Sequence, residues 1–231
     1  MKPLAGVVKK IGVFGGTFNP IHYGHLRAAL EVREKLEFEK IFLVPSGVPP
    51  LKGSDLAPSA DRLEMTRLAT LSTPLFEISD IECRQPGKSY TVETLKILQG
   101  MYPEKRLYLI LGIDAFLEIP AWYQPITLLE EYDFVVISRP AYTFESLSPV
   151  LSIDSAMMGA LDASSIEIMT TYLKSGREAI LLNVTPLQIS ATAIRNLVRM
   201  GKSIKYLLPE AVESYIISHN LFREGSGSLR Q

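Results

Sequence analysis

The chain has 231 residues, of which 47% are hydrophobic and 21% are charged, and its formal net charge is −1. This composition is that of a globular protein, and the length suits one α/β domain. The balanced charge argues against a nucleic-acid-binding surface, which needs clustered cations. Cys83 is the single cysteine, so no intrachain disulfide can form, and no apolar stretch is long enough to cross a bilayer. We therefore expect a cytoplasmic protein with no nucleic-acid or membrane partner.

Short apolar runs alternate with helical patterns in the first half of the chain. The runs that are typical of buried strands fall at 11–14, 41–44 and 76–81. The segments with apolar residues near helical spacing fall at 25–36, 59–71 and 91–98. We expect Asp61 and Glu64 to form a capping box on the second helix, and Gly100 to end the third.

The second half of the chain continues this alternation. Its apolar runs predict strands at 107–111, 134–137 and 179–184. Ser190 is expected to cap a helix that runs to Met200, with Gly201 directly after it. Pro209 is placed to open a last helix that runs to Ile217. The segment from Tyr142 to Gly176 shows only weak periodicity and supports no clear prediction.

Strands that alternate with helices predict a doubly wound α/β fold, in which helices cover both faces of a parallel sheet. We expect one domain over residues 1–223, including a small helical C-terminal part. Residues 224–231 contain Gly and Ser in alternation, which predicts a flexible tail. Ligands of such folds bind at the carboxyl ends of the strands, near the point where the strand order reverses.

A glycine- and histidine-containing segment follows the first predicted strand. It reads Gly15-Gly16-Thr17-Phe18-Asn19-Pro20-Ile21-His22-Tyr23-Gly24-His25. Glycines at a strand end allow backbone N–H groups to approach a phosphate. His22 and His25 are three residues apart at the start of a helix, so both imidazoles lie on one face beside a helix N-terminus that favours anions. The pattern predicts a polyphosphate site; the alternative is an ordinary turn with two structural histidines.

A second polar cluster follows the last predicted strand. It contains Ile189, Ser190, Thr192 and Arg195. Ser190 as an N-cap leaves first-turn N–H groups available to an anion, and a guanidinium one turn later can hold phosphate oxygens. On its own this cluster is equally consistent with an ordinary capped helix.

Together the two segments resemble the signatures of the (T/H)xGH nucleotidylyltransferase superfamily, whose second signature is Ile-Ser-Ser-Thr-x-Ile-Arg. Asn19 stands where members of that superfamily usually have aspartate, and Ala191 replaces the second serine. The resemblance implies a Rossmann-like nucleotidylyltransferase fold. It assigns catalysis to His22, His25 and Arg195, which would contact the ATP phosphates. The residues it implies for ATP binding are Gly15, Gly16, Thr17, Phe18, Gly24, Ile189, Ser190 and Thr192.

The middle of the chain resembles the nicotinate-nucleotide adenylyltransferases. The matching segments are Pro45 to Lys52, with Leu51 in place of a histidine, Glu82 to Leu95, and Gly112 to Phe116 followed by Trp122. The resemblance implies that the pyridine nucleotide is bound by Asn19, Lys52, Tyr90, Thr91, Asp114, Trp122, Tyr123 and Arg139.

Three of these residues have specific implied roles, each with a structural alternative. Asp114 would accept hydrogen bonds from ribose hydroxyls, whereas an aspartate after a strand is often a helix N-cap. Trp122 would stack on the pyridine ring, whereas a single tryptophan is often a core residue. Arg139 would contact a phosphate, whereas an arginine that closes a strand often forms a surface salt bridge.

The resemblance implies transfer of AMP from ATP to nicotinate mononucleotide, which yields nicotinate adenine dinucleotide and pyrophosphate. The acceptor phosphate would attack directly in line, without a covalent enzyme intermediate. Mg²⁺ would be bound through the ATP phosphates, with no metal site built by the protein. The alternatives are the same chemistry on nicotinamide mononucleotide or a phosphopantetheine, and a non-catalytic nucleotide sensor. A homo-oligomer stays open.

Overall fold

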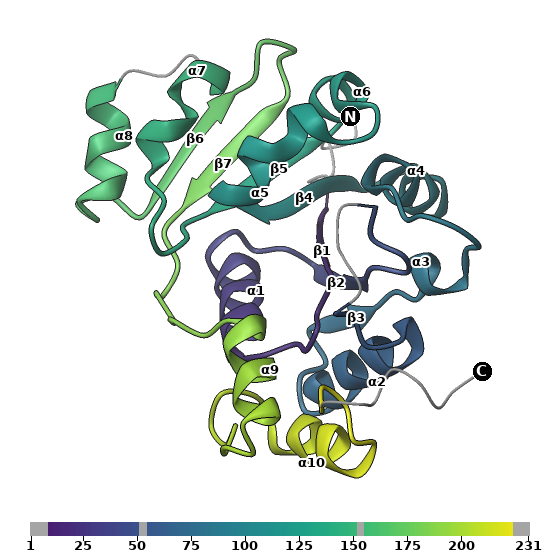
Figure 1. Cartoon of the computed structure of the whole chain (residues 1–231). Coiled ribbons are helices and arrows are strands. Elements are labelled where there is room, and N and C mark those ends of the chain that lie inside the picture. The colour runs from purple at the N-terminus through teal and green to yellow at the C-terminus, as the bar shows by residue number, and fades with distance from the viewer. Residues whose placement is uncertain (1–8, 51–54, 152–154, 224–231) are drawn as a thin grey trace.

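The computed structural model describes residues 9–50, 55–151 and 155–223 (Figure 1). Its centre is a seven-stranded sheet in the order β3-β2-β1-β4-β5-β7-β6. The strands are β1 (Lys10–Gly16), β2 (Lys40–Pro45), β3 (Phe76–Ile78), β4 (Arg106–Gly112), β5 (Asp133–Ile137), β6 (Ile168–Tyr172) and β7 (Glu178–Leu182). All neighbours are parallel except β6 and β7. The strand order reverses between β1 and β4, which confirms the doubly wound fold.

Helices cover both faces of this sheet (Figure 1). They are α1 (Tyr23–Lys35), α2 (Ser59–Thr70), α3 (Ile81–Arg84), α4 (Thr91–Met101), α5 (Ile113–Glu118), α6 (Pro125–Glu131), α7 (Ser148–Leu151), α8 (Ser155–Asp162), α9 (Ala191–Arg199) and α10 (Glu210–Ser218). Two short 3₁₀ helices are η1 (Ile119–Ala121) and η2 (Phe144–Leu147). Helices α1, α2, α9 and α10 share one apolar core with the sheet, and α4 to α8 share the other.

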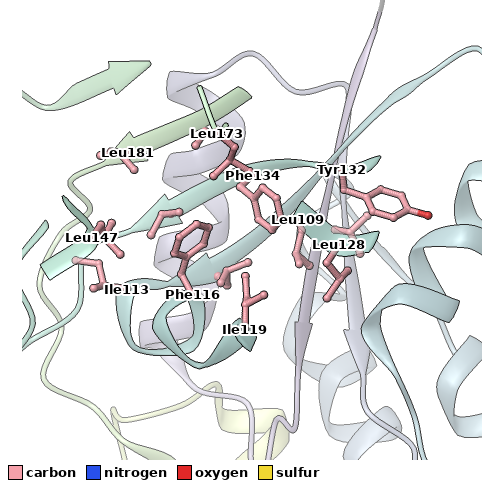
Figure 2. Close-up of a cluster of buried hydrophobic side chains, with 14 of the residues drawn as sticks. Leu109, Ile113, Phe116, Ile119, Leu128, Tyr132, Phe134, Leu147, Leu173 and Leu181 are labelled. Atoms are coloured by element: carbon pink, nitrogen blue, oxygen red, sulfur yellow. The ribbon is translucent and has the colours of Figure 1, made fainter. Parts of the chain in front are cut away.

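The central strands are apolar on both sides because both of their faces are buried. In β4, Leu107, Leu109 and Leu111 enter one core, while Tyr108 and Ile110 enter the other. Figure 2 shows the first of these cores, where side chains from the helices lie over those from the strands. The packing of these two layers against the sheet fixes the positions of the strand ends that carry the site.

Aromatic contacts tie α5 to the sheet. The rings of Phe116 and Phe134 meet edge to face, with centroids 5.5 Å apart (Figure 2). Gly12 in β1 allows equally close packing on the other face, since a Cβ there would lie 2.5 Å from the Ile41 side chain and 2.6 Å from that of Ile110. Such contacts leave room for very little movement of β1 relative to its neighbours.

The predicted C-terminal helices are present, and they belong to the main packing. Ile194 of α9 and Val212 and Ile216 of α10 are fully buried in the core that α1 and α2 also line. Ser190 is the N-cap of α9, where its Oγ accepts a hydrogen bond from the Ala193 N–H at 3.1 Å. The prediction for that helix start is therefore confirmed.

Several details of the helix ends are corrected. Pro58 occupies the N-cap position of α2, and no side chain caps this helix, so the capping box predicted for Asp61 and Glu64 is wrong. Asp61 instead accepts a hydrogen bond from the Tyr215 hydroxyl at 2.8 Å, which links α2 to α10. Gly100 does not end α4, which continues to Met101.

The strand predicted at 76–81 is shorter than expected, because β3 ends at Ile78 and Ile81 already begins α3. The segment from Tyr142 to Gly176 contains η2, α7, α8 and the antiparallel edge strand β6. Only Met169 of β6 is buried, which explains the weak apolar pattern there. The tail predicted at 224–231 lies outside the described residues.

Within the described ranges, no helix has the length and apolar character that a membrane span requires.

Candidate active site

The predicted site residues gather at one edge of the sheet, where the parallel strands end. The segments after β1, β2, β4 and β5 and the start of α9 lie at this edge. Since the strand order reverses between β1 and β4, this is the position where ligands bind in doubly wound folds. Lys52 and Leu51 lie outside the described residues.

The two predicted catalytic histidines are stacked on one another at the start of α1. Their ring centroids are 3.8 Å apart, and the ring planes are inclined at 29°. His22 is the N-cap residue, and its carbonyl accepts hydrogen bonds from the N–H groups of His25 and Leu26 at 3.0 and 3.2 Å. The structure therefore places both imidazoles side by side at a helix N-terminus, as the spacing predicted.

The glycines and Phe18 of the same segment shape this histidine pair. A Cβ on Gly24 would lie 3.0 Å from Cε1 and Nδ1 of His22, so a side chain there would displace the ring. The Phe18 ring is buried and packs edge-on against His25 with centroids 5.1 Å apart. Gly15 and Gly16 are the last residues of β1, where they pair with Val44 and Pro45, so the strand extends two residues beyond the apolar run at 11–14. The backbone of Phe18 is in the left-handed region, with a φ of 44°.

His22 is buried, with 3% of its surface exposed, and this environment changes its chemistry. Burial, followed by the positive charge of Arg139, lowers the pKa of His22 from 6.5 to about 4. The ring is therefore neutral at physiological pH. Its Nδ1 atom has no hydrogen-bond partner within the described part of the chain. A buried polar atom of this kind is suited to bonding a ligand.

Arg195 reaches from α9 back to the segment after β1. Its Nε donates to Oδ2 of Asp55 at 2.9 Å, and its Nη1 donates to the Asn19 carbonyl at 2.9 Å. Nη2 lies 3.4 Å from Oγ1 of Thr192, one turn earlier on the same helix. Arg199 also pairs with Asp55, and the two guanidinium groups, Arg199 first, lower the pKa of that carboxyl.

Asn19 is engaged by the protein through both ends of its side-chain amide. Its Nδ2 donates to the Asp55 carbonyl at 2.8 Å, and its Oδ1 accepts from the Ala57 N–H at 3.0 Å. The side chain thus holds the 55–57 segment against the loop that follows β1.

On the other side of the point where the strand order reverses, Asp114 and Arg139 face one another. Oδ1 of Asp114 lies 3.5 Å from Nε of Arg139, and both atoms are buried without a hydrogen-bond partner among the described residues. Asp114 is in the first turn of α5, whose N-cap is Gly112, so the N-cap alternative is not what the structure shows. A Cβ on Gly112 would collide with both charged groups, so a side chain there would displace the Asp114–Arg139 pair.

Of the three aromatic residues predicted for the pyridine nucleotide, Tyr90 and Tyr123 lie side by side, and Trp122 packs against the core. The rings of Tyr90 and Tyr123 are 4.4 Å apart between centroids. Trp122 is half-buried and packs against the core that α5 and α6 line, so it combines partial exposure with a structural contact. Thr91 is the first residue of α4, directly after Tyr90.

Sequence reasoning missed several polar residues that support these loops. Arg62 is 1% exposed and donates hydrogen bonds to the carbonyls of Ala57, Thr17, Ser46 and Gly47. The Glu82 carboxylate accepts a hydrogen bond from Thr94 at 2.7 Å, and burial raises its pKa. Glu82 and Thr94 lie within a motif that the sequence singled out, whereas nothing local marks Arg62.

Mg²⁺ is the metal ion that the resemblance implies for this site. Within the described residues, no group of three or more His, Cys, Asp or Glu side chains lies close enough to hold a metal ion. Mg²⁺ keeps several water ligands and is commonly bound through substrate phosphates, and the buried Nδ1 of His22 at the start of α1 is an atom that such phosphates could meet.

The model of the cytidylyltransferase-like family matches residues 13–197 of this chain. The chain therefore belongs to this family of nucleotidyltransferases, and it is an enzyme.

Curated relatives of this chain show which group of enzymes within the family it belongs to. The probable nicotinate-nucleotide adenylyltransferase of Desulfatibacillum aliphaticivorans is 41% identical over 226 residues, which cover 92% of this chain and 99% of the relative. That of Syntrophotalea carbinolica is 40% identical over 217 residues, with coverages of 93% and 97%. Within the family, the chain belongs to the nicotinate-nucleotide adenylyltransferases.

A solved structure shares the fold. Plasmodium falciparum nicotinic acid mononucleotide adenylyltransferase, complexed with NaAD, superposes with a TM-score of 0.72 at 21% identity, covering 93% of this chain and 97% of that one. The same enzyme complexed with APC gives a TM-score of 0.69. These likenesses agree with the Rossmann-like nucleotidylyltransferase fold.

Proposed function

We propose that this enzyme transfers AMP from ATP to nicotinate mononucleotide, giving nicotinate adenine dinucleotide and pyrophosphate. The observation that carries the proposal is the stacked pair His22 and His25, at a helix N-terminus, facing the end of β5, where Arg139 is close enough to depress the His22 pKa. An anionic ligand at this point would meet imidazole groups, helix amides and a guanidinium together.

We assign ATP to the phosphate side of the site, defined as residues 15–25 with 189–195. Phosphate oxygens beside His22 would give its Nδ1 a partner and would offset the effect of Arg139 on its pKa. Arg195 is already aimed at this segment through the Asn19 carbonyl. Charge that builds up on the leaving pyrophosphate would be stabilised by these groups.

We assign the pyridine nucleotide to the acceptor side, defined as Tyr90, Thr91, Asp114, Trp122, Tyr123 and Arg139. Asn19, for which the resemblance implied the same role, is placed on the phosphate side instead, because both ends of its side-chain amide are bonded to the 55–57 segment. The buried Asp114 oxygen and Arg139 nitrogen are matched to ribose hydroxyls and a phosphate, respectively. The half-exposed aromatic rings offer a surface on which a pyridine ring can stack.

The reaction needs no enzyme nucleophile. An oxygen of the acceptor phosphate forms a bond to the α-phosphorus of ATP, the bond from that phosphorus to the bridging oxygen breaks, and pyrophosphate leaves with the electron pair. The protein holds the two substrates in line and stabilises the developing charge. We infer that Mg²⁺, carried by the phosphates and water, neutralises part of the triphosphate charge.

The alternative acceptors and the sensor alternative are separated by one assay. Pyrophosphate release from ATP is measured with nicotinate mononucleotide, nicotinamide mononucleotide and phosphopantetheine in parallel. We expect the highest kcat/KM with nicotinate mononucleotide. Higher efficiency with nicotinamide mononucleotide would reassign the acceptor, and release with none of them would favour the sensor.

We also propose that the enzyme is cytoplasmic and that residues 1–223 form one domain.

A further inference from the structure

Arg62 is a buried charge that the proposed chemistry does not use. It lies in the first turn of α2, and 1% of its surface is exposed. Among the described residues its guanidinium forms no ion pair to a carboxylate; its partners are four backbone carbonyls and, at 3.3 Å, the Oγ of Ser46. Burial lowers the pKa of the group, which reflects the cost of removing a cation from water. A charge kept at this cost in the interior calls for an explanation.

The four carbonyls come from three separate segments around the site. Nη1 donates to Thr17 at 2.9 Å and to Ser46 at 2.5 Å. Nη2 donates to Gly47 at 2.6 Å, and Nε donates to Ala57 at 3.0 Å. Thr17 follows β1, Ser46 and Gly47 follow β2, and Ala57 precedes α2. The planar guanidinium group of Arg62 thus joins the loop after β1, on the phosphate side, to the loop after β2, which lies beside the acceptor side.

The connection continues beyond Arg62 to the acceptor side. The Gly47 N–H donates to Oγ of Ser89 at 3.0 Å, and the Ser89 N–H donates to the Val48 carbonyl at 2.9 Å. Ser89 directly precedes Tyr90, which is the N-cap of α4. A Cβ on Gly47 would collide with the Glu82 carbonyl, so this loop has no room to relax toward α3.

We propose that Arg62 is a positioning residue for adenylyl transfer, whose guanidinium sets the distance and angle between the loop after β1 and the loop after β2. This inference rests on the proposed assignment of the phosphate side and the acceptor side to the two substrates, with the loop after β2 joined to the acceptor side through Ser89. In-line attack depends on the relative placement of two bound molecules, and a displacement of about 1 Å can cost about 100-fold in rate. Arg62 would act on that placement from behind the site, without touching either substrate.

The geometry requires a guanidinium rather than a positive charge alone. The five N–H donors of arginine lie in a rigid plane, and here they are divided among three nitrogens that reach separate carbonyls. The lysine ammonium carries its donors on one atom. Lysine would therefore keep the charge but could not hold all three segments together.

The test compares Arg62→Met and Arg62→Lys with the control variant Arg106→Met. Arg106 begins β4 at the opposite end of that strand from Gly112, and pairs with Asp133 at 2.6 Å and Glu178 at 3.1 Å. Its loss removes a partly buried arginine far from the strand ends that carry the site. Pyrophosphate release is followed with ATP and nicotinate mononucleotide, below the melting temperature of every variant, and kcat and both KM values are determined.

We expect Arg62→Met to lower kcat by about 10- to 100-fold while each KM changes by less than about 3-fold, since the residues assigned to each substrate are all still present. Arg62→Lys should retain no more than about a tenth of the wild-type kcat and carries the test if Arg62→Met does not fold. Arg106→Met should keep kcat within about 2-fold while its melting temperature falls.

If Arg62→Lys had the wild-type kcat, the guanidinium group would not be needed, and this result would overturn the proposal. Unchanged kcat in Arg62→Met, or a loss of kcat in Arg106→Met as large as in the Arg62 variants, would also overturn it. Failure of the proposed function itself is separate, because the wild-type enzyme would then release no pyrophosphate with this acceptor.

Discussion

On the phosphate side of the site, Asn19 and Arg195 are held by the protein and the Nδ1 of His22 has no hydrogen-bond partner among the described residues, whereas on the acceptor side both facing polar atoms, Asp114 Oδ1 and Arg139 Nε, lack such a partner. Asn19 and Arg195 are both bonded to the 55–57 segment or its neighbours. Asp114 and Arg139 are joined only by a 3.5 Å ion pair. If the proposed assignment holds, the phosphate side is preorganised and the pyridine nucleotide would supply the missing partners on the acceptor side. Changes on the two sides should therefore affect kcat and KM differently.

The largest effect is expected from loss of a histidine on the phosphate side. His22→Ala should lower kcat by about 10²- to 10³-fold, because a preorganised donor to the transition state is lost. KM for ATP should change much less. Steady-state kinetics check this, with His219→Ala as the control, since His219 lies exposed directly after α10. Near-normal turnover in His22→Ala and in His25→Ala would refute their assignment to catalysis.

The buried environment of His22 also predicts how stability depends on pH. The pKa of His22 is about 4 in the folded chain and 6.5 in the unfolded chain, so the unfolded state binds more protons between these values. Stability should therefore fall as the pH drops from 6.5 to 4, with His22 accounting for about 3 kcal/mol.

Urea unfolding at pH 7 and pH 4 measures this effect in the wild type and in His22→Gln. The informative quantity is the difference between the two proteins, because every other titrating group is shared. An equal loss of stability in both would show that His22 is not held neutral by its surroundings.

A smaller effect, confined to the acceptor, is expected from Asp114→Asn. The change removes the negative charge from a group that we assign to ribose hydroxyls, so KM for nicotinate mononucleotide should rise by about 10-fold. KM for ATP should stay within about 2-fold. Glu118→Gln, an exposed change in the same helix, is the matched control. A rise in KM for ATP alone would place Asp114 on the phosphate side.

The smallest effect is expected at Trp122. Replacement by alanine should raise KM for the pyridine nucleotide by about 3- to 10-fold, which is the contribution of one aromatic contact. Trp122→Phe should recover most of this loss. Unchanged KM values together with a marked fall in melting temperature would show that Trp122 serves only the core it packs against.

The parts of the fold that were predictable from sequence are those with strong local signals. The strands around 11–14, 107–111 and 134–137 are buried on both faces and appear as continuous apolar runs. Ser190 was identified as an N-cap because that role depends on one residue and its nearest neighbours. The edge strand β6 was missed because one side of it is exposed.

The site was predictable to the same degree and for the same reason. His22 and His25 lie three residues apart at one helix start, so their spacing alone places them together. Arg62 and Asp55 act across long sequence separations, and their partners are backbone carbonyls or side chains of other elements. No local pattern records which carbonyls a buried guanidinium will reach, so such support appears only in the folded chain.

In the proposed mechanism, the enzyme positions a nucleophile that the substrate already carries and forms no covalent bond to substrate itself. The stereochemistry at the α-phosphorus tests this directly, with ATP that carries a single chiral sulfur substitution at that phosphorus and nicotinate mononucleotide as acceptor. One in-line displacement predicts inversion of configuration in the dinucleotide product. Retention would require two displacements through a covalent adenylyl-enzyme and would contradict the account.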